Sequence, residues 1–129
     1  FSLPLSFHLP HAQDQAEAAE CVGELEGNEA FWRFSDELYE RTKSNKGFAY
    51  EKIQPLAEEL GVNGSDFAAC MESDRHLEII QSHSSEASAM GISGTPGNLI
   101  RNNNTGEVKL LGGAYPFEAF TQIIDAMLK

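Results

Sequence analysis

The chain has 129 residues, of which 41% are hydrophobic and 9% aromatic, a composition typical of one globular domain rather than of a disordered or fibrous chain. Twenty acidic residues oppose nine Lys and Arg residues, and no segment gathers the basic side chains that a nucleic acid or an anionic membrane would require. No run of about 18 apolar residues indicates a membrane span, and the first residues lack the basic and apolar regions of a signal peptide.

The first part of the sequence indicates a short extended segment followed by a helix. Residues 1–7 are interpreted as the tail of a strand running into a loop, in which Pro4 is tolerated at a sheet edge. A helix is expected from Pro10 to about Leu25, because Pro suits a first helical turn and Gly27 lies just beyond the end.

Two more helices are expected next. Asn28 is the predicted N-cap of a helix that runs to about Lys43. This helix carries the bulkiest apolar side chains of the chain, namely Phe31, Trp32, Phe34, Leu38 and Tyr39. The following helix ends at Leu60, and Pro55 either starts it or kinks it.

Another pair of helices completes the helical region. Ser65 is the predicted N-cap of a short helix through Met71, and Ser73 is the predicted N-cap of a longer helix that Gly91 ends. The longer helix has apolar residues at Leu77, Ile80, Ala87 and Met90. Five helices are therefore expected between the strand tail and Gly91.

The pattern changes after this region. Residues 98–101 and 107–111 predict two short strands, and the turn-forming residues 102–106 join them into a hairpin. A final helix is expected to begin near Pro116. Its apolar residues recur at helical spacing, at Phe117, Phe120, Ile123, Ile124, Met127 and Leu128.

The sharpest local motif is Gly94-Thr95-Pro96, which joins a helix directly to the first strand of the hairpin. The motif and the order of elements resemble those of thioredoxins, in which the peptide bond before this proline is cis. For an X-Pro bond the cis form costs only about 0.5–1 kcal/mol more free energy than the trans form. The resemblance implies that the backbone of Thr95 faces outward, where an extended substrate could pair with it as an added strand. The alternative is an ordinary loop, since Gly-Thr-Pro tripeptides are widespread.

The chain resembles the DsbA-like branch of the thioredoxin superfamily over nearly its whole length. The matching segments are residues 4–8, 18–21, 31–32, 60–62, 67–70, 91–96 and 112–120. The resemblance implies an α/β, thioredoxin-like fold, mostly helical here, with a helical insertion and an incomplete sheet. A single domain is expected, made of a strand tail and loop (1–7), the insertion (8–91) and the cis-Pro loop, hairpin and C-terminal helix (92–129). Gly97 departs from the pattern, because a residue better suited to a strand is expected there and a glycine could loosen the loop.

The function that the resemblance implies is that of a protein thiol:disulfide oxidoreductase of the periplasm or cell envelope. Its partners would be cysteine-containing protein substrates and a redox partner protein, with no cofactor, no nucleic acid and no membrane insertion. Gly94, Thr95 and Pro96 are the expected substrate-binding residues. No catalytic residue is assigned within the chain.

The Cys-x-x-Cys pair of such proteins would lie upstream of Phe1, where the sequence opens without Met as if at a processing or cloning boundary. The chain as given is therefore expected to lack the redox pair and to be inactive alone. The missing strands would come from an N-terminal piece or from a second copy in a homodimer, or the chain would be repacked as a largely helical domain.

Two other function classes compete with this one. The chain could be a non-catalytic module whose insertion helices and Pro96 loop hold a peptide or partner without redox turnover. It could also be a relative of kappa-class glutathione transferases or 2-hydroxychromene-2-carboxylate isomerases, which share the inserted architecture but bind glutathione with an upstream serine. The segment Gly112–Phe120 looks more like the disulfide enzymes.

The two cysteines, Cys21 and Cys70, leave two alternatives open. They are either buried free thiols or a structural disulfide that joins the first helix to the fourth. The even count and the oxidising compartment implied by the resemblance favour the disulfide, which would contribute about 4 kcal/mol by closing its loop.

The four histidines are His8, His11, His76 and His83. A metal site needs three or four convergent ligands with supporting hydrogen bonds, and no cysteine or carboxylate falls at a recognised spacing beside them. We therefore expect no metal site and interpret these histidines as solvated side chains.

Overall fold

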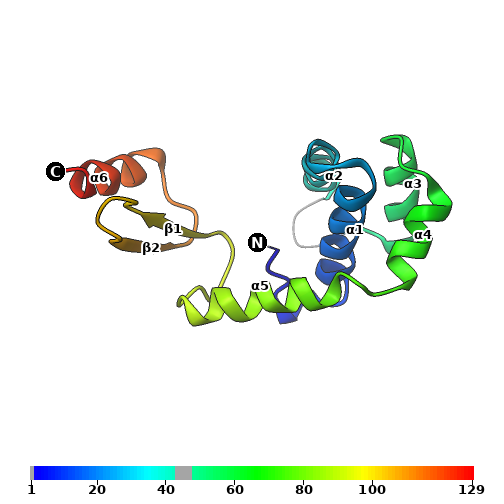
Figure 1. Ribbon diagram of the computed structural model, residues 1–129, viewed down its shortest axis with the longest axis horizontal. Coiled ribbons are helices and arrows are strands. Elements are labelled where there is room, and N and C mark those ends of the chain that lie inside the picture. Colours follow the sequence, from blue (N-terminus) through cyan, green and yellow to red (C-terminus); the bar gives the residue numbers. More distant parts are fainter. Residues whose placement is uncertain (1, 43–47) are drawn as a thin grey trace. The chain divides into compact units, whose positions relative to one another are not determined.

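The computed structural model describes residues 2–42 and 48–129, so the predictions at Phe1 and Lys43 lie outside the described residues. The chain divides into two compact units, Phe1–Ser84 and Ser85–Lys129, and each is described by itself. In chain order the elements are the 3-10 helix η1 (Ser6–His8), α1 (His11–Glu26), α2 (Asn28–Arg41), the 3-10 helix η3 (Tyr50–Lys52), α3 (Ile53–Glu59), α4 (Gly64–Glu72), α5 (Leu77–Ala89), β1 (Gly97–Arg101), β2 (Val108–Gly112) and α6 (Phe117–Met127) (Figure 1). Whether the two units form the single predicted domain stays a prediction.

Helix α1 is the centre of the N-terminal unit and begins and ends within one residue of its predicted bounds. It packs against α2 and α4, while α3 packs against α4 (Figure 1). Small side chains on α1 permit close packing: a β-carbon at Gly23 would lie 3.3 Å from the β-carbon of Phe31 on α2. Gly27, at φ 87°, then separates the two helices.

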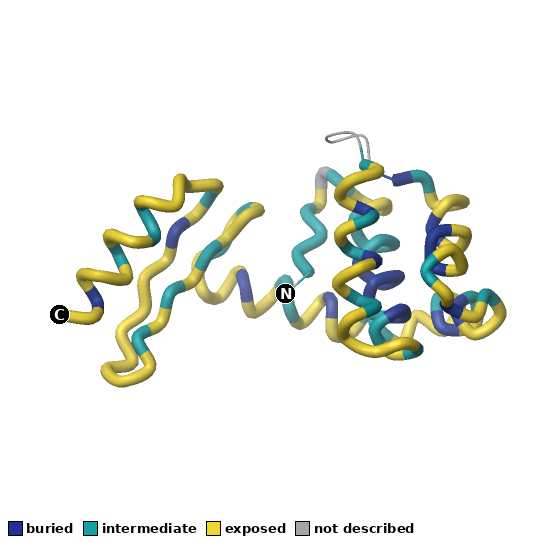
Figure 2. The backbone as a smooth tube through the Cα atoms, turned by 90° about the horizontal axis from the view of Figure 1, so that it is seen from above, coloured by how far each residue is buried: buried dark blue, intermediate teal, exposed yellow. Residues whose placement is uncertain are grey.

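One hydrophobic core holds the N-terminal unit together. Its buried members come from α1, α2, α3, α4 and two connecting segments: Ala18, Ala19, Cys21, Val22, Phe34, Leu38, Phe48, Ile53, Leu56, Ala57, Val62, Phe67 and Cys70. Figure 2 shows these buried stretches on the helices of this unit. Two of the bulky side chains predicted for the second helix lie outside the core, since Trp32 is 59% and Tyr39 81% exposed.

The predicted strand tail at residues 1–7 is wrong over the described part of the chain. Residues 2–5 form no regular element, and η1 follows at once. The sheet found among the described residues consists of β1 and β2, and residues 2–5 are not part of it. A strand without a partner leaves its backbone groups to water.

The predicted helix starts need three corrections. Gly27, not Asn28, is the N-cap of α2. The N-cap of α4 is Asn63 rather than Ser65, and its side chain accepts hydrogen bonds from the N–H groups of Ser65 (3.0 Å) and Asp66 (3.1 Å). Ser73 ends α4 instead of starting α5, because its hydroxyl donates to the Cys70 carbonyl (2.6 Å).

Pro55 does not occupy either of the two positions predicted for it, at the start of the third helix or at a kink. Pro55 is the third residue of α3, inside the first turn, where a missing N–H leaves no hydrogen bond of the helix unmade. It therefore neither begins the helix nor kinks it.

The C-terminal unit confirms the predicted hairpin and final helix. β1 and β2 are antiparallel, with Gly97 opposite Gly112 and Arg101 opposite Val108. Asn102 organises the turn, since its Oδ1 accepts from two following N–H groups and its Nδ2 donates to the Met127 carbonyl of α6 (2.6 Å). Buried side chains in this unit are few, among them Ala87, Leu111 and Met127.

Several large apolar side chains of the C-terminal unit are exposed within it. They are Leu99, Val108 and Leu110 on the hairpin and Phe117, Ile124 and Leu128 on or beside α6. No helix within residues 2–42 and 48–129 is long and apolar enough to cross a membrane.

Candidate functional site

The predicted substrate-binding loop lies at the start of β1. The peptide bond between Thr95 and Pro96 is cis, and both residues are exposed while Gly94 is partly buried. The Pro96 carbonyl accepts a hydrogen bond from the N–H of Gly113 (2.8 Å), which continues the β1–β2 ladder by one residue. The loop is thereby fixed to the sheet on the side of β2.

The backbone of Thr95 is open for pairing. Among the described residues, none donates to its carbonyl or accepts from its N–H. An exposed donor and acceptor at a strand's entry are the groups that an extended peptide needs for strand addition. The three predicted residues are therefore adjacent, accessible on the surface of their unit and chemically able to bind a backbone.

The presence of glycine at position 97 has a steric explanation that the sequence alone does not reveal. A β-carbon at this position would overlap Cγ2 of Ile92 and lie 3.3 Å from the Gly94 carbonyl oxygen. The glycine thus lets Ile92 pack over the first residue of β1. The absence of a side chain at Gly97 therefore allows close packing, and the prediction that this glycine loosens the loop is wrong.

Cys21 and Cys70 form a disulfide that joins α1 to α4, with their Cα atoms 5.9 Å apart. Both residues are fully buried. Of the two alternatives left open by the sequence, the disulfide holds. The expectation that this chain has no redox cysteine pair is accordingly not borne out: it has no Cys-x-x-Cys, but two cysteines 49 positions apart meet on packed helices and are bonded.

A cluster of polar side chains lies on one side of this disulfide, next to the hydrophobic core. A potential ligand nitrogen of His76 lies within 4.8 Å of both sulfur atoms. The Nε2 atom of His76 lies 2.8 Å from Oε2 of Glu24, and the guanidinium of Arg75 donates to both oxygens of the same carboxylate (2.9 and 2.7 Å). Hydrogen bonds from Arg75 and then from His76 lower the pKa of Glu24.

The turn at residues 73–76 delivers these side chains. Asp74 has φ 52°, in the left-handed region that Asp tolerates better than most residues. The turn places Arg75 and His76 against α1, more than 50 positions earlier in the sequence. The proximity of His76 to the two cysteines therefore depends on a tertiary contact, which the sequence does not reveal.

Glu17 adds a buried carboxyl to the same side of the unit. It is 4% exposed and precedes Cys21 by four residues on α1, so the two side chains lie on one helix face. Its Oε1 atom is buried and has no hydrogen-bond partner. Burial raises the pKa of Glu17, and the nearby carboxylate of Asp74 raises it further.

The other histidines lie elsewhere in the chain: His8 in η1, His11 at the exposed start of α1, and His83 in α5. Within the described ranges, only Cys21, Cys70 and His76 bring three potential metal-ligating atoms this close together. These three residues define the candidate metal-binding group, at a place where the sequence predicts no metal site.

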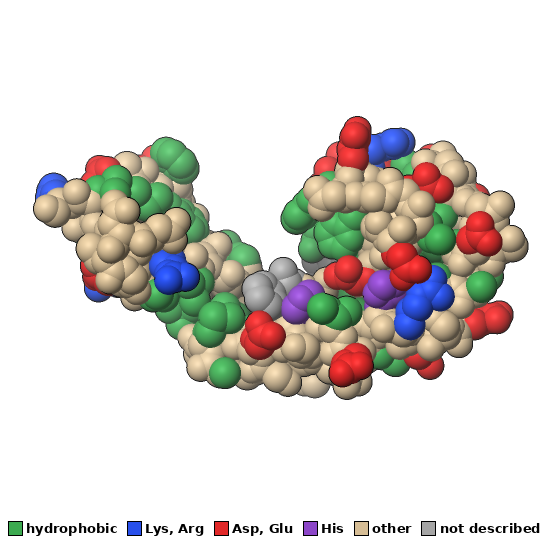
Figure 3. All heavy atoms as spheres, viewed as in Figure 1, with side chains coloured by type: hydrophobic (Ala, Val, Ile, Leu, Met, Phe, Trp, Pro, Cys, Tyr) green, Lys and Arg blue, Asp and Glu red, His purple; other side chains and the backbone are tan. Residues whose placement is uncertain are grey.

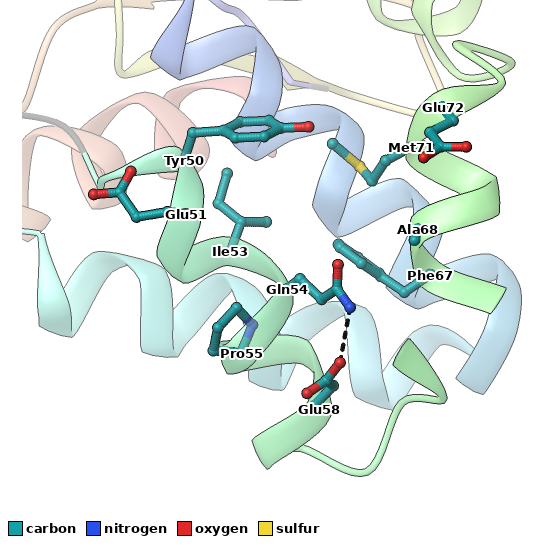
Figure 4. A pocket seen from close by; sticks show the side chains of 10 residues that line it. All are labelled: Tyr50, Glu51, Ile53, Gln54, Pro55, Glu58, Phe67, Ala68, Met71 and Glu72. Carbon is teal, nitrogen blue, oxygen red and sulfur yellow. Dashed lines mark hydrogen bonds between the residues drawn. The ribbon is translucent and has the colours of Figure 1, made fainter. Parts of the chain in front are cut away.

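A pocket of about 390 Å³ opens between η3, α3 and α4 of the N-terminal unit (Figure 4). Ile53, Phe67 and Met71 give it an apolar floor, and Glu58 on its edge accepts a hydrogen bond from Gln54 (2.8 Å). The remaining lining residues are Tyr50, Glu51, Pro55, Ala68 and Glu72. The pocket therefore combines an apolar interior with acidic groups and has no Lys or Arg in its lining.

Figure 3 shows acidic side chains scattered over the visible face of the N-terminal unit, with few Lys or Arg side chains among them. The arrangement agrees with the net charge of −11 and gives no basic patch on that face. The charge of this surface does not favour a polyanionic ligand.

Comparison with known proteins settles the family. The sequence matches the family described as DSBA-like thioredoxin domain over residues 1–125. The chain belongs to this family. The crystal structure of Pseudomonas aeruginosa DsbA2 is similar to it, with 27% sequence identity and a TM-score of 0.77, over 97% of this chain and 68% of that chain. No curated protein sequence matches the chain.

The DSBA-like assignment confirms the predicted fold class, a thioredoxin-like fold that is mostly helical and has a small antiparallel sheet. It also supports the broad functional class, because the family is one of thiol:disulfide oxidoreductases.

Proposed function

We propose that this chain is part of a protein thiol:disulfide oxidoreductase that exchanges disulfides with cysteine-containing proteins in the periplasm or cell envelope. Its partners would be those substrates and a protein that restores its redox state. The observation that carries the proposal is the loop Gly94-Thr95-Pro96, exposed at Thr95 and Pro96, in a chain of the DSBA-like family.

The loop would bind the substrate segment through its backbone. The N–H and C=O of Thr95 are unengaged among the described residues and stand at the entry of β1. An extended segment that pairs with them would present its cysteine at a fixed distance from the loop. Backbone pairing makes few demands on side chains, which suits an enzyme that acts on many different cysteine-containing proteins.

We assign the Cys21–Cys70 disulfide a structural role within this function. Thiol–disulfide exchange requires a thiolate to approach a sulfur atom of the disulfide directly. Both cysteines are fully buried between α1 and α4, so a protein thiol has no access to them in the folded chain. The bridge would hold the two helices together while exchange takes place elsewhere.

The test is an exchange assay on the protein in the length that its cell makes. A reduced, unfolded protein with two cysteines serves as substrate, and its thiols are counted by mass spectrometry after alkylation. Gly94→Arg should slow exchange at least tenfold, because a β-carbon at Gly94 meets no atom within 4 Å and the long side chain would cover the loop without disturbing the fold. Asn103→Arg, which adds the same charge at the exposed turn of the same unit, should leave the rate unchanged.

The outcomes separate the parts of the proposal. A folded protein that exchanges no thiols with this substrate would overturn the oxidoreductase function. Equal rates for Gly94→Arg and Asn103→Arg would overturn the role of the loop. A Cys21→Ala, Cys70→Ala variant should keep its exchange activity, and its loss in a folded variant would overturn the structural role of that bridge.

The pocket favours a second candidate function, a non-catalytic module that binds a peptide. Its apolar floor and acidic edge would suit a segment that carries an apolar anchor beside a Lys or Arg. Binding of such a peptide by the wild type, lost with Ala68→Trp and unaffected by Gly94→Arg, would support this function. Tight binding combined with no thiol exchange would favour it over the first.

A further inference from the structure

We propose that Cys21, Cys70 and His76 bind one Zn²⁺ ion when the disulfide between the two cysteines is reduced. The disulfide and the zinc site would then be two alternative states of the same residues, and the redox environment would decide between them. The proposal concerns the N-terminal unit alone and does not depend on the activity proposed above.

The three donors already converge. One ligand atom from each residue lies within 4.8 Å of the others, and the residues come from α1, α4 and the turn at 73–76. Tetrahedral zinc with bonds of about 2.3 Å to sulfur places two sulfur atoms roughly 3.8 Å apart. Cysteines whose Cα atoms are 5.9 Å apart reach that separation by rotating their side chains once the S–S bond is broken.

Glu24 prepares His76 for this role. Because an ionised carboxylate only accepts hydrogen bonds, the Nε2 atom that contacts Glu24 carries the proton. A neutral imidazole then has its free lone pair on Nδ1, the atom that would bind a cation. A carboxylate behind a ligating histidine is the usual support in zinc sites, and Arg75 in turn fixes Glu24 with two hydrogen bonds.

Charge and burial favour a cation at this place. Reduction of the disulfide would leave two fully buried sulfur atoms, which are stable as thiolates only beside a positive charge. Glu17 already holds a buried oxygen atom without a partner one turn before Cys21 on the same helix. The surroundings thus offer oxygen as well as sulfur ligands, whereas the guanidinium of Arg75 is engaged by Glu24.

The chemistry balances with a small dithiol as reductant, which reaches the buried bond when the unit opens locally. The dithiol gives two electrons and two protons to the Cys21–Cys70 bond and becomes a disulfide, leaving two thiols in the protein. Zn²⁺ then displaces one proton from each thiol, and His76 and one water complete four-coordination. Reoxidation by a disulfide removes two electrons from the thiolates, re-forms the S–S bond and releases the ion.

The experiment uses Co²⁺ as the probe on the whole chain, because cobalt bound by thiolates gives near-ultraviolet charge-transfer bands and tetrahedral d–d bands in the visible. The chain is reduced with a phosphine under anaerobic conditions and titrated with Co²⁺. We expect one equivalent to bind with these bands and Zn²⁺ to displace it, whereas the oxidised chain gives no such bands.

His76→Ala should weaken Co²⁺ binding at least tenfold and alter the d–d bands, whereas His11→Ala, which changes an exposed histidine of α1, should do neither. Glu24→Gln should keep the bands and weaken binding by roughly 10–100-fold, the usual effect of removing such support.

Circular dichroism of the same samples keeps the test decisive if the reduced chain unfolds. Metal that restores the helical signal in the wild type but not in His76→Ala supports the site. The proposal is wrong if the reduced wild type shows no thiolate bands, or if His76→Ala and His11→Ala bind Co²⁺ with equal affinity and identical spectra.

Discussion

Ile92 and Gly97 are in contact across the loop that opens β1, and any β-carbon at position 97 would overlap Cγ2 of Ile92. Ile is branched at its β-carbon and has few rotamers, so it cannot readily turn away from an added atom. The contact explains why a residue with poor strand propensity occupies the first position of the strand.

Replacing Gly97 by Ala should therefore destabilise the C-terminal unit by about 1–3 kcal/mol, as is typical of overpacking. The matched control is Gly112→Ala on the opposite strand, where an added β-carbon meets no atom within 4 Å. Amide hydrogen exchange of the hairpin measures both effects. The double variant Ile92→Ala, Gly97→Ala should recover part of the loss, and strictly additive effects would contradict the contact.

Breaking the bridge between α1 and α4 should lower the stability of the N-terminal unit. Closure of a loop of this length accounts for about 4 kcal/mol of the free energy of unfolding in the chain-entropy description. The Cys21→Ala, Cys70→Ala variant should unfold at a clearly lower urea concentration than the oxidised wild type, followed by far-ultraviolet circular dichroism. Intact mass should rise by two hydrogens when the wild type is reduced.

The cap of α4 provides a local test. Asn63→Ala should destabilise the N-terminal unit by about 1 kcal/mol, since two backbone N–H groups lose the acceptor that they share. Ser65→Ala removes only a hydroxyl that donates to Asn63 (2.8 Å) and should cost about half as much or less. If Ser65→Ala were the more damaging change in urea unfolding, the assignment of the cap would be wrong.

Glu17 should make stability depend on pH. Burial, and then Asp74, raise the pKa of Glu17 in the folded chain above its ordinary value of 4.5. The folded state thus binds the proton more tightly than the unfolded state, so the contribution of Glu17 is fully present below that value and is lost as pH rises through the raised pKa.

Glu17→Gln should consequently stabilise the chain at neutral pH and bring no benefit below pH 4.5, as measured by urea unfolding across that range. Glu26→Gln is the control, because it removes the same charge from an exposed position of the same helix. A benefit of Glu17→Gln that is equal at all pH values would point to packing rather than to the buried charge.

Much of the fold could be predicted from short sequence patterns, such as turn-forming residues and helix-ending residues. The hairpin was predictable because turn-forming residues separate two short apolar segments, and α1 was predictable because Pro10 and Gly27 mark its ends. The cap of α4 was misplaced by two residues because Asn63 and Ser65 are both good caps, and sequence alone does not show which side chain faces the free N–H groups.

The candidate sites also differ in whether the sequence could predict them. The loop at Thr95 lies within one continuous motif, so its residues could be named from the sequence. His76 could not be placed beside the cysteines, because the turn after α4 and the packing of α4 on α1 together create that proximity. Gly97 was misread for a similar reason, since Ile92 covers it only in the folded chain.

The Cys21–Cys70 bridge also makes a covalent ring that contains α2 and α3. A protease that cuts one peptide bond inside the ring opens it without separating the two ends of the polypeptide. A nicked chain would migrate as a single species in a non-reducing gel and would fall into two pieces only after its disulfide is reduced.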